Sequence, residues 1–405
     1  MANLALLGGE SIIKKKPPHF IWPIIDESTE RAVIEQLHTS ISIYNRSGPI
    51  MELEEYFKKR FSKKYALLFN SGTMAIFTLL YALRLKKDDE VIFPTYTFFA
   101  TASPCYTLGI KPVFCDCDAT GNISPDDLAS KISNNTKAIM ITHMWGIPCN
   151  MDAINFIAEN KGIPLLEDCS HAFGAKFKES EVGSASTAAV WSLQGQKVLT
   201  AGEGGVLVTD DEDIYYNALL LGHYNKRCRE EIKDDFIDKR YEVTGFGLKL
   251  RIHPLAAAIA IQQATIIDAV LDKRAKCFNR LKQGIDCIPG FKVSFPEYSH
   301  MSSGYAFIFH YDPEYFGDIP KDKIVEALHA EGCYELDVPN STRPIHDYPL
   351  FKSMHIDKSA SFPNAARFHH TALKLPVWHA DENEELIDQY LKAIAKVSAN
   401  KGELL

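Results

Sequence analysis

The sequence lacks a long apolar run, a long basic run and any paired metal-ligand spacing. No segment approaches about 20 consecutive apolar residues, the length that crosses a bilayer. The 44 Lys and Arg residues stand against 52 Asp and Glu residues and leave a net charge of −8. Such a balance disfavours binding to nucleic acid or to an anionic membrane. The nine cysteines form no CxxC pair, so neither a zinc site nor a disulfide framework is expected.

Internal repeats and low-complexity segments are also missing. The first apolar run, within MANLALLGGESIIKKK, precedes the lysines and is too short for a signal peptide. The chain has 405 residues, of which 46% are hydrophobic and 24% are charged. This composition is typical of a soluble globular protein, and the length suggests two or three domains. We therefore expect a cytoplasmic enzyme with reduced cysteines.

Short apolar segments alternate with helical segments over the first two-thirds of the chain. Ser124 and Asn150 are each placed to cap a helix, with Gly162 as a stop signal. The expected strands are YALLF, EVIF, KPVFCDCD, KAIMITHMWG, GIPLLED, AAVWSL and GGVLVT. Apolar strands separated by helices predict an α/β fold with a mostly parallel sheet that is covered on both faces.

The pattern changes at His253-Pro254. The segment from there to Gly284 predicts one helix of about 30 residues that ends at this glycine. Strand-like FKVSF and YAFIFHY, the helix PKDKIVEALHAEG and a final amphipathic stretch follow. We therefore expect a large α/β domain over residues 1–252 and a smaller α+β domain over residues 253–405.

The polar turn Asn70-Ser71-Gly72-Thr73 stands where a helix begins. Free backbone N–H groups and two hydroxyls at such a point can surround a phosphate, and Gly72 lets the backbone approach it closely. The turn is neither a GxxxxGK[ST] nucleotide loop nor a GxGxxG dinucleotide turn. An ordinary capped helix start explains the same residues, because capping residues of this kind are common.

Asp168 ends the strand-like segment GIPLLED, and Lys197 follows 29 residues later in WSLQGQKVLTAGEGG. An acid at the carboxyl end of a buried strand faces the crevice where α/β sheets bind ligands, although it can equally cap the next helix. A lysine between a strand and a glycine turn suits Schiff-base chemistry if its pocket excludes water. Most single lysines, however, are solvated on the surface.

Together these features predict one site for pyridoxal 5′-phosphate. The cofactor needs a phosphate cradle, an acid for its pyridine nitrogen and a lysine for the Schiff base. The three occur in that order within one expected domain. The aromatic patch Tyr96-Thr97-Phe98-Phe99 follows a strand and offers a ring to stack on the cofactor, while core packing explains at least one of its rings.

The chain resembles the DegT/DnrJ-type sugar aminotransferases, a family of fold-type I pyridoxal-phosphate enzymes. The resemblance covers nearly the whole length and is carried by LALLGG, NSGTMA, VIFPTYTFFAT, EDCSHAFGAKF, VGSASTAAVWSLQGQKVLTAGEGGVLVT and GLKLRIHPLAAAIA. The first and last of these segments are most similar to the branch of cyclitol aminotransferases and aminohydroxybenzoate synthases. The resemblance implies a large α/β domain with a smaller α+β domain, and a homodimer with its sites at the subunit interface.

The resemblance also implies roles for individual residues. Lys197 stands where the family forms its Schiff base, and Asp168 stands where an acid pairs with the pyridine nitrogen. The other positions that match the family's cofactor contacts are Ser71, Gly72, Thr73 and Ser192 at the phosphate and Phe98 over the ring.

Three positions depart from the family pattern or match it loosely. Position 171 is His where many members have Gln, and His171 is expected to reach the cofactor's phenolic oxygen. Lys249 replaces an Asn that reaches the cofactor phosphate of the partner subunit, a contact that lysine can make as a point charge. His346 in RPIHDYP resembles a family histidine near the substrate, and an ordinary loop histidine explains it equally well.

The implied activity is amino transfer from glutamate or glutamine to a keto-cyclitol or a keto-sugar, with or without a nucleotide. Pyridoxamine phosphate is the expected intermediate form of the cofactor, and Lys197 the expected general base. Three alternatives stay open. One is a dehydratase on the same fold, in whose branch a histidine replaces the lysine. The others are an aromatising aminohydroxybenzoate synthase and a non-catalytic sensor. No metal, nucleic-acid or membrane partner is expected.

Overall fold

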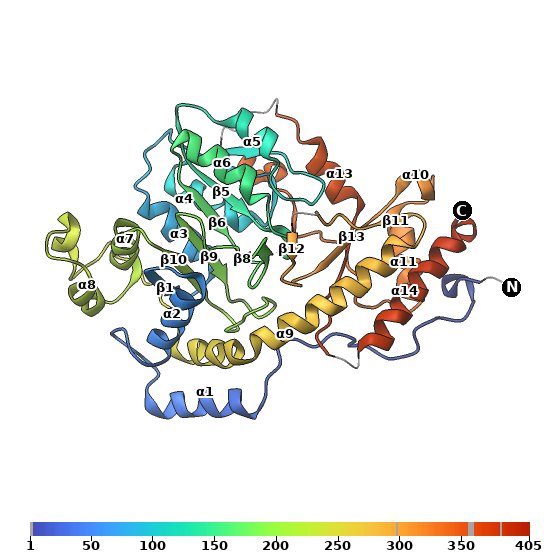
Figure 1. The fold of residues 1–405 in the computed structure, drawn as a ribbon, viewed down its shortest axis with the longest axis horizontal. Helices are drawn as coiled ribbons and strands as arrows, with labels where there is room; N and C mark the ends of the chain where they lie inside the picture. The colour runs from blue at the N-terminus through green and yellow to red at the C-terminus, as the bar shows by residue number, and fades with distance from the viewer. Residues whose placement is uncertain (1–2, 297–298, 355–359, 381–382) are drawn as a thin grey trace.

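The computed structural model describes residues 3–296, 299–354, 360–380 and 383–405. Its centre is a seven-stranded sheet (Figure 1). In spatial order the strands are β1 (Tyr65–Phe69), β10 (Gly205–Thr209), β9 (Ala188–Ser192), β6 (Leu165–Asp168), β5 (Thr136–Thr142), β2 (Glu90–Pro94) and β4 (Lys111–Cys115). Only β10 runs antiparallel to its neighbours within this sheet. The predicted mostly parallel sheet is confirmed.

Both faces of the sheet are buried, as the near-continuous apolar strands predict. In β1, Leu67 and Phe69 pack with α3 (Gly72–Ala82) and α7 (Glu212–Gly222). Ala66 and Leu68 face the opposite core, with α2 (Gly48–Phe61) and α6 (Met151–Lys161). The alternation follows from the two-residue period of a strand. Hydrophobic burial on both sides therefore fixes the register of the sheet.

The predicted helix boundaries follow their capping residues. Ser124 caps α5 (Pro125–Lys131), and its hydroxyl accepts the N–H of Asp127. Asn150 caps α6 in the same way, and Gly162 ends it with a left-handed φ of +61°. These local signals act within one turn, so the sequence alone identifies them.

The long helix α9 (Pro254–Asp286) confirms the predicted thirty-residue helix but continues past Gly284. Gly284 permits close packing rather than ending the helix, because an added Cβ would lie 2.4 Å from Cδ1 of Leu391. Leu391 belongs to α14 (Glu384–Ala399), which crosses α9 there.

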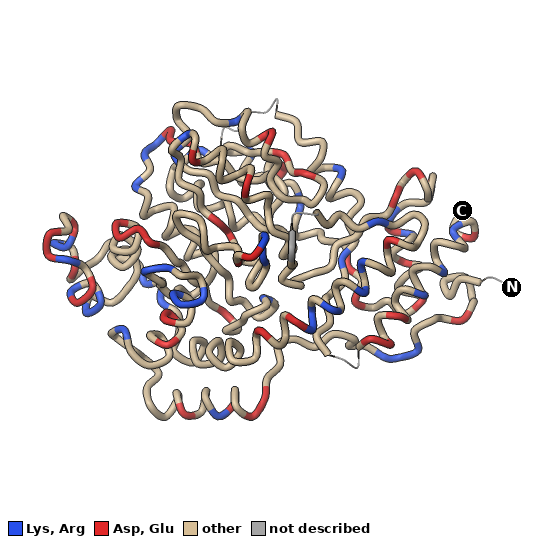
Figure 2. Tube along the Cα trace, viewed as in Figure 1, with Lys and Arg blue, Asp and Glu red and all other residues tan. Residues whose placement is uncertain are grey.

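Helix α9 is also the one described helix that is long and apolar enough to cross a membrane. Its most apolar 18-residue window has a mean hydropathy of 1.5, and 44% of that window is buried. No residue of α9 before Asp268 is charged, and the blue and red segments of the helix in Figure 2 lie toward its C-terminal end. The apolar first half packs against α2 and α1 (Glu27–Thr39), as a core helix does. The absence of a membrane-spanning segment stays a prediction.

A smaller antiparallel sheet lies beyond α9, formed by β11 (Phe291–Lys292), β13 (Phe307–Tyr311) and β15 (Ala372–Leu375). It packs with α14 and α11 (Lys321–Ala330) in a separate core. Leu4 and Ile13 belong to this core, and the two chain ends lie on the same side of the molecule (Figure 1). The N-terminal segment thus packs with the C-terminal elements, and the division at residues 252 and 253 stays a prediction.

The other elements are short. The helices are α4 (Pro104–Leu108), α8 (Asn225–Glu231), α10 (Pro313–Phe316), α12 (Pro349–Lys352) and α13 (Pro363–Thr371). The strands are β3 (Tyr96–Thr97), β7 (Lys176–Phe177), β8 (Ser180–Glu181), β12 (Ser299–Met301) and β14 (Arg343–Pro344). Six 3-10 turns complete the described elements, at Ala5–Leu7, Phe99–Thr101, Met144–Gly146, Ile237–Tyr241, Ile345–Asp347 and Lys401–Leu404.

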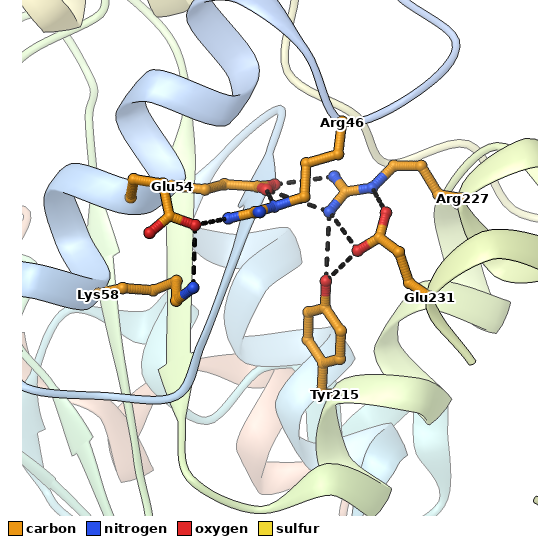
Figure 3. Close-up of polar contacts among 7 residues, drawn as sticks. Arg46, Glu54, Lys58, Tyr215, Arg227 and Glu231 are labelled. Carbon is orange, nitrogen blue, oxygen red and sulfur yellow. Dashed lines mark hydrogen bonds and ion pairs between the residues drawn. The ribbon is translucent and has the colours of Figure 1, made fainter. Parts of the chain in front are cut away.

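A buried ion cluster fastens α8 to the rest of the large unit (Figure 3). Arg227 of α8 binds both carboxylate oxygens of Glu54 in α2, at 2.8 and 3.1 Å, and its Nε lies 2.6 Å from Glu231. Arg46 Nε reaches the same Glu54 at 2.8 Å, and the hydroxyl of Tyr215 donates to Glu231. The charges are mutually satisfied, which a buried ion pair requires.

Candidate active site

The predicted site residues meet at one edge of the sheet. β1, β6 and β9 are parallel to one another, so their carboxyl ends lie on the same side. The turn after β1 begins α3, while Ser192 and Asp168 are the last residues of β9 and β6. This edge is where open α/β sheets bind ligands.

The turn after β1 lies directly against the end of β9. A Cβ added to Gly72 would lie 2.7 Å from Cβ and 2.9 Å from Cα of Ser192. Ser71 caps α3, and its hydroxyl accepts the N–H of Met74 at 3.2 Å. Gly205 permits the same closeness from the other side, because an added Cβ would lie 2.3 Å from the carbonyl oxygen of Ser71. Two predicted phosphate contacts, Gly72 and Ser192, are therefore neighbours around the start of a helix, which attracts anions.

The Asp168 carboxylate is buried and held from two directions. Its Oδ2 accepts the hydroxyl of Thr101 at 2.7 Å, and its Oδ1 accepts the N–H of Ser170 at 3.1 Å. Asp168 is 3% exposed and Thr101 is fully buried. The two hydrogen bonds fix the orientation of the carboxylate. The arrangement places this carboxylate in the wall of the cavity that contains Lys197.

Lys197 lies in the loop between β9 and β10. Its N–H donates to the carbonyl of Gln194 at 2.8 Å, and its carbonyl accepts the indole N–H of Trp22 at 2.8 Å. Its Nζ lies 4.8 Å from the ring centroid of Tyr305. Burial lowers the pKa of Lys197 to about 8, although the charge of Asp168 opposes this. A lysine with a lowered pKa has the neutral amine available as a nucleophile or base.

His171 forms part of an aromatic stack beside Lys197. Its ring centroid lies 4.1 Å from that of Tyr305 and 5.5 Å from that of Trp145. Burial lowers the pKa of His171 well below its usual value, and the positive charge of Lys197 adds to the effect. Nδ1 of His171 is buried without a hydrogen-bond partner among the described residues. An unpaired buried ring nitrogen is costly, so a ligand is expected to satisfy it.

These residues line one cavity of about 350 Å³, which we call the cofactor cavity. Eight of the ten predicted site residues line it: Ser71, Gly72, Thr73, Phe98, Asp168, His171, Ser192 and Lys197. The other lining residues are Ile76, Ala100, Thr142, Trp145, Ser170, Gln194, Gln196, Glu203, Tyr305, Ser341, Thr342 and Lys374. The structure thus brings together residues that lie as far apart as 71 and 374.

Lys249 and His346 do not line this cavity. Lys249 is exposed, next to Leu250, whose carbonyl accepts the N–H of Asn70 at 2.7 Å. His346 is half-buried, and its Nδ1 lies 2.6 Å from Oγ1 of Thr95. Within one chain, neither side chain belongs to the cavity wall, and their predicted roles stay predictions.

One group of potential metal ligands occurs among the described residues, namely His143, Glu167 and Cys169. Nε2 of His143 lies 2.7 Å from Glu167, and its Nδ1 accepts the N–H of Cys149 at 3.0 Å. Both ring nitrogens therefore have partners, and the histidine has no free lone pair for a metal ion. The hydrogen bond from His143 to Glu167 links β6, the strand that carries Asp168, to the segment after β5.

A model of the DegT/DnrJ/EryC1/StrS aminotransferase family matches residues 23–392. The chain belongs to this family. Its members are pyridoxal-phosphate-dependent aminotransferases, which confirms the resemblance read from the sequence.

Relatives of known name match over nearly the full length. The chain is 29% identical to the spore coat polysaccharide biosynthesis protein SpsC of Bacillus subtilis, covering 95% of this chain and 98% of that protein. It is 29% identical to a putative L-glutamine:3-amino-2,3-dideoxy-scyllo-inosose aminotransferase of Micromonospora echinospora, covering 99% and 98%. Among solved structures, an E. coli GDP-4-keto-6-deoxy-D-mannose-3-dehydratase with bound hydrated PLP aligns with a TM-score of 0.82 at 25% identity, covering 92% and 98%. The fold-type I architecture is confirmed.

The residues of the cofactor cavity fit the family's cofactor, pyridoxal 5′-phosphate. The helix start beside Ser192 offers N–H groups and hydroxyls for a phosphate. Asp168 offers a fixed carboxylate for a pyridinium N–H, and Nδ1 of His171 is an orphaned polar atom in the same wall. Lys197 supplies the amine. All three needs of the cofactor are met by described residues.

Sequence reasoning missed Thr101, Trp145, Tyr305 and Lys374. Trp145 adopts a left-handed φ of +57° within a 3-10 turn after β5, which no local pattern signals. Tyr305 reaches the cavity because the hydroxyl of Ser303 donates to the carbonyl of His171 at 2.6 Å. Such contacts join segments more than a hundred residues apart. The hydrophobic periodicity of the sequence does not indicate them.

Proposed function

We propose that this protein is an aminotransferase that moves an amino group from glutamate or glutamine to the ketone of a keto-sugar or keto-cyclitol. We further propose that it works as a cytoplasmic homodimer. The observation that carries the proposal is the meeting of Lys197, Asp168 and the turn at Gly72 in one cavity. The named relatives, one of them a putative cyclitol aminotransferase, support the substrate class.

When bound, pyridoxal phosphate supplies an electron sink for the bonds at the amine-bearing carbon. The protein's residues orient it and handle the protons. The start of α3 and Ser192 would hold the phosphate, and Asp168 would keep the pyridine nitrogen protonated. His171, neutral in its buried stack, would meet the phenolic oxygen through Nδ1.

Lys197 would act twice. Its Nζ would first anchor the cofactor and then, as a free amine, would carry the proton from the substrate's Cα to the cofactor's C4′. The lowered pKa of about 8 suits this role, because the base must be neutral in a useful fraction near pH 7. The lysine also disfavours the dehydratase alternative, whose branch of the family carries a histidine at this position.

The absorption spectrum of the purified protein tests the proposal. We expect a visible band that glutamate or glutamine shifts to the amine form of the cofactor, and that a keto-cyclitol or keto-sugar restores. In Lys197→Ala the donor-dependent shift should be lost. A wild-type protein that holds the cofactor but responds to no amino donor would refute amino transfer and favour the dehydratase or sensor functions.

A further inference from the structure

A second cavity adjoins the cofactor cavity through a shared wall. Trp145, Gln196, Tyr305 and Lys374 line both. The second cavity, which we call the distal cavity, has a volume of about 470 Å³, within the usual range for small-molecule sites. Its other lining residues are Phe20, Trp22, Ala306, Tyr334, Glu335, Leu336, Asp337, Leu375 and Pro376.

Aromatic side chains form one part of the distal cavity. Trp22 is fixed on two sides, since its indole N–H donates to the carbonyl of Lys197 at 2.8 Å and Arg274 lies 4.2 Å from its ring centroid. Phe20 and Tyr334 add two more rings. Aromatic faces cover the C–H faces of a saturated ring well, because they are apolar and flat. A ligand on Trp22 would lie beside the loop that carries Lys197.

Carboxylates form the polar part of the distal cavity. Oε1 of Glu335 accepts the backbone N–H of His19 at 2.7 Å. Oε2 has no hydrogen-bond partner among the described residues, so it is free to accept from a ligand. Asp337 pairs with Lys374, whose Nζ lies 2.5 Å from Oδ2.

Within one chain, the charge balance of the lining disfavours an anionic ligand. Lys374 is the one Lys or Arg in the described lining, and Asp337 already neutralises it. The carboxylate of Glu335 therefore has no cationic partner among the residues that line the distal cavity. Phosphate groups are bound by arginines, lysines or free N–H groups, and a neighbouring carboxylate repels them. Hydroxyl and ammonium groups are instead the natural donors to a free carboxylate oxygen.

We propose that the distal cavity binds the body of the amino-group acceptor, and that this acceptor is a polyhydroxylated six-membered ring without phosphate whose hydroxyl or amino group donates to Glu335. The inference rests on the proposed amino transfer and narrows its substrate class. Of the acceptors that the family resemblance implies, it selects a keto-cyclitol or a keto-sugar without a nucleotide over a nucleotide-linked keto-sugar.

The test is calorimetric binding of product-like amines to the full-length protein loaded with pyridoxal phosphate, without glutamate or glutamine. The probes are scyllo-inosamine, glucosamine, GDP and dTDP. We expect one of the two amines to bind with the highest affinity, and Glu335→Gln to weaken it about tenfold or more, as the loss of a charge-assisted hydrogen bond implies. The preferred amine distinguishes a cyclitol from an amino sugar. Glu335→Gln keeps an oxygen for the N–H of His19, and the exposed Glu326→Gln on α11 is the matched control.

Tighter binding of GDP or dTDP than of either amine would overturn the inference. So would absent binding of both amines, or an affinity that Glu335→Gln leaves unchanged. The donor-dependent absorption shift is measured on the same samples. If that shift is present and the binding result negative, only the substrate class is wrong; if the shift is absent, amino transfer itself fails.

Discussion

Asp168 and Lys197, the two central residues of the candidate site, have different surroundings. Asp168 receives two hydrogen bonds to its carboxylate. Lys197 is placed where burial opposes its charge and lowers its pKa. The carboxylate is thus held in place by hydrogen bonds, while burial favours the neutral form of the amine. Each difference leads to a measurable effect.

Replacing Lys197 with Met should stabilise the cofactor-free protein at pH 7. The folded pKa of Lys197 falls from 10.5 to about 8, so folding at neutral pH holds a proton on a buried amine at a cost of up to about 3 kcal/mol. The cost is complete below pH 8, shrinks as the pH rises from 8 to 10.5 and vanishes above. Urea unfolding of both proteins from pH 6 to 10.5 measures it.

The exposed Lys276 of α9 offers a control, and Lys276→Met should change stability by less than about 0.5 kcal/mol. A Lys197→Met protein that is less stable than wild type at pH 7, or equally stabilised at every pH, would contradict the assignment of a desolvated amine.

Thr101 should act as a positioning residue for Asp168. In Thr101→Val the carboxylate loses the 2.7 Å hydrogen bond to Oδ2, worth about 1.5–3 kcal/mol because the acceptor is charged. We expect the affinity for pyridoxal phosphate to fall about tenfold or more, measured by equilibrium titration of the cofactor-free protein. Thr101→Ser retains the hydroxyl and should bind nearly as well as wild type. Equal affinity of the Val and Ser variants would exclude the role.

The residues that meet in the cofactor cavity could be predicted where chemistry and chain order coincide. The turn at Gly72, the acid at the end of β6 and the lysine before the glycine turn stand out because each has a local signature. Tyr305 has none, since a tyrosine within a strand-like run reads as core. Its place in the site depends on the contact of Ser303 with His171, which only the folded chain creates.

At the scale of elements, the length of a segment decides how far it could be predicted. The seven strands of the main sheet have four to seven residues and continuous apolar character. The strands β3, β7, β8, β12 and β14 have two or three residues, too few for any periodicity to appear. At Gly284 a local signal predicts the wrong result. Glycine is a common helix stop, but here it lies within α9, where the missing side chain lets Leu391 pack closely.

The buried cluster around Arg227 predicts the attachment strength of α8 (Figure 3). Arg227→Met would leave Glu54 in a buried site with Arg46 as its remaining partner. Breaking a buried pair from one side typically costs about 3–5 kcal/mol, and we expect a loss of this size in urea unfolding. Arg280→Met removes an exposed pair with Asp388 and should cost less than about 1 kcal/mol. Similar losses in the two variants would show that the cluster contributes no more than a surface pair.

At the scale of the whole molecule, the site is assembled from both ends of the chain. Trp22, from the N-terminal segment, holds the carbonyl of Lys197, and Lys374 of β15 lines the same cavity. The N-terminal segment itself packs in the core of the C-terminal elements. The sequence predicted two units in succession, because composition changes once along the chain. No local pattern indicates that the first twenty residues pack with the second unit, because that contact depends on tertiary packing.

The proposed homodimer gives the exposed Lys249 a testable role at the site of the partner subunit. Its side chain does not line the cavity of its own chain, yet its neighbour Leu250 accepts the N–H of Asn70 at the phosphate turn. If Lys249 serves the partner subunit, Lys197→Ala and Lys249→Ala should each be nearly inactive alone. Unfolded together and refolded as a mixture, they should recover up to about a quarter of wild-type activity. Half of the dimers would be mixed, and one of the two sites in each would contain both lysines. Mixing each variant with itself is the control. A mixture that recovers no activity, although size measurements show mixed dimers, would place Lys249 in the site of its own chain or in none.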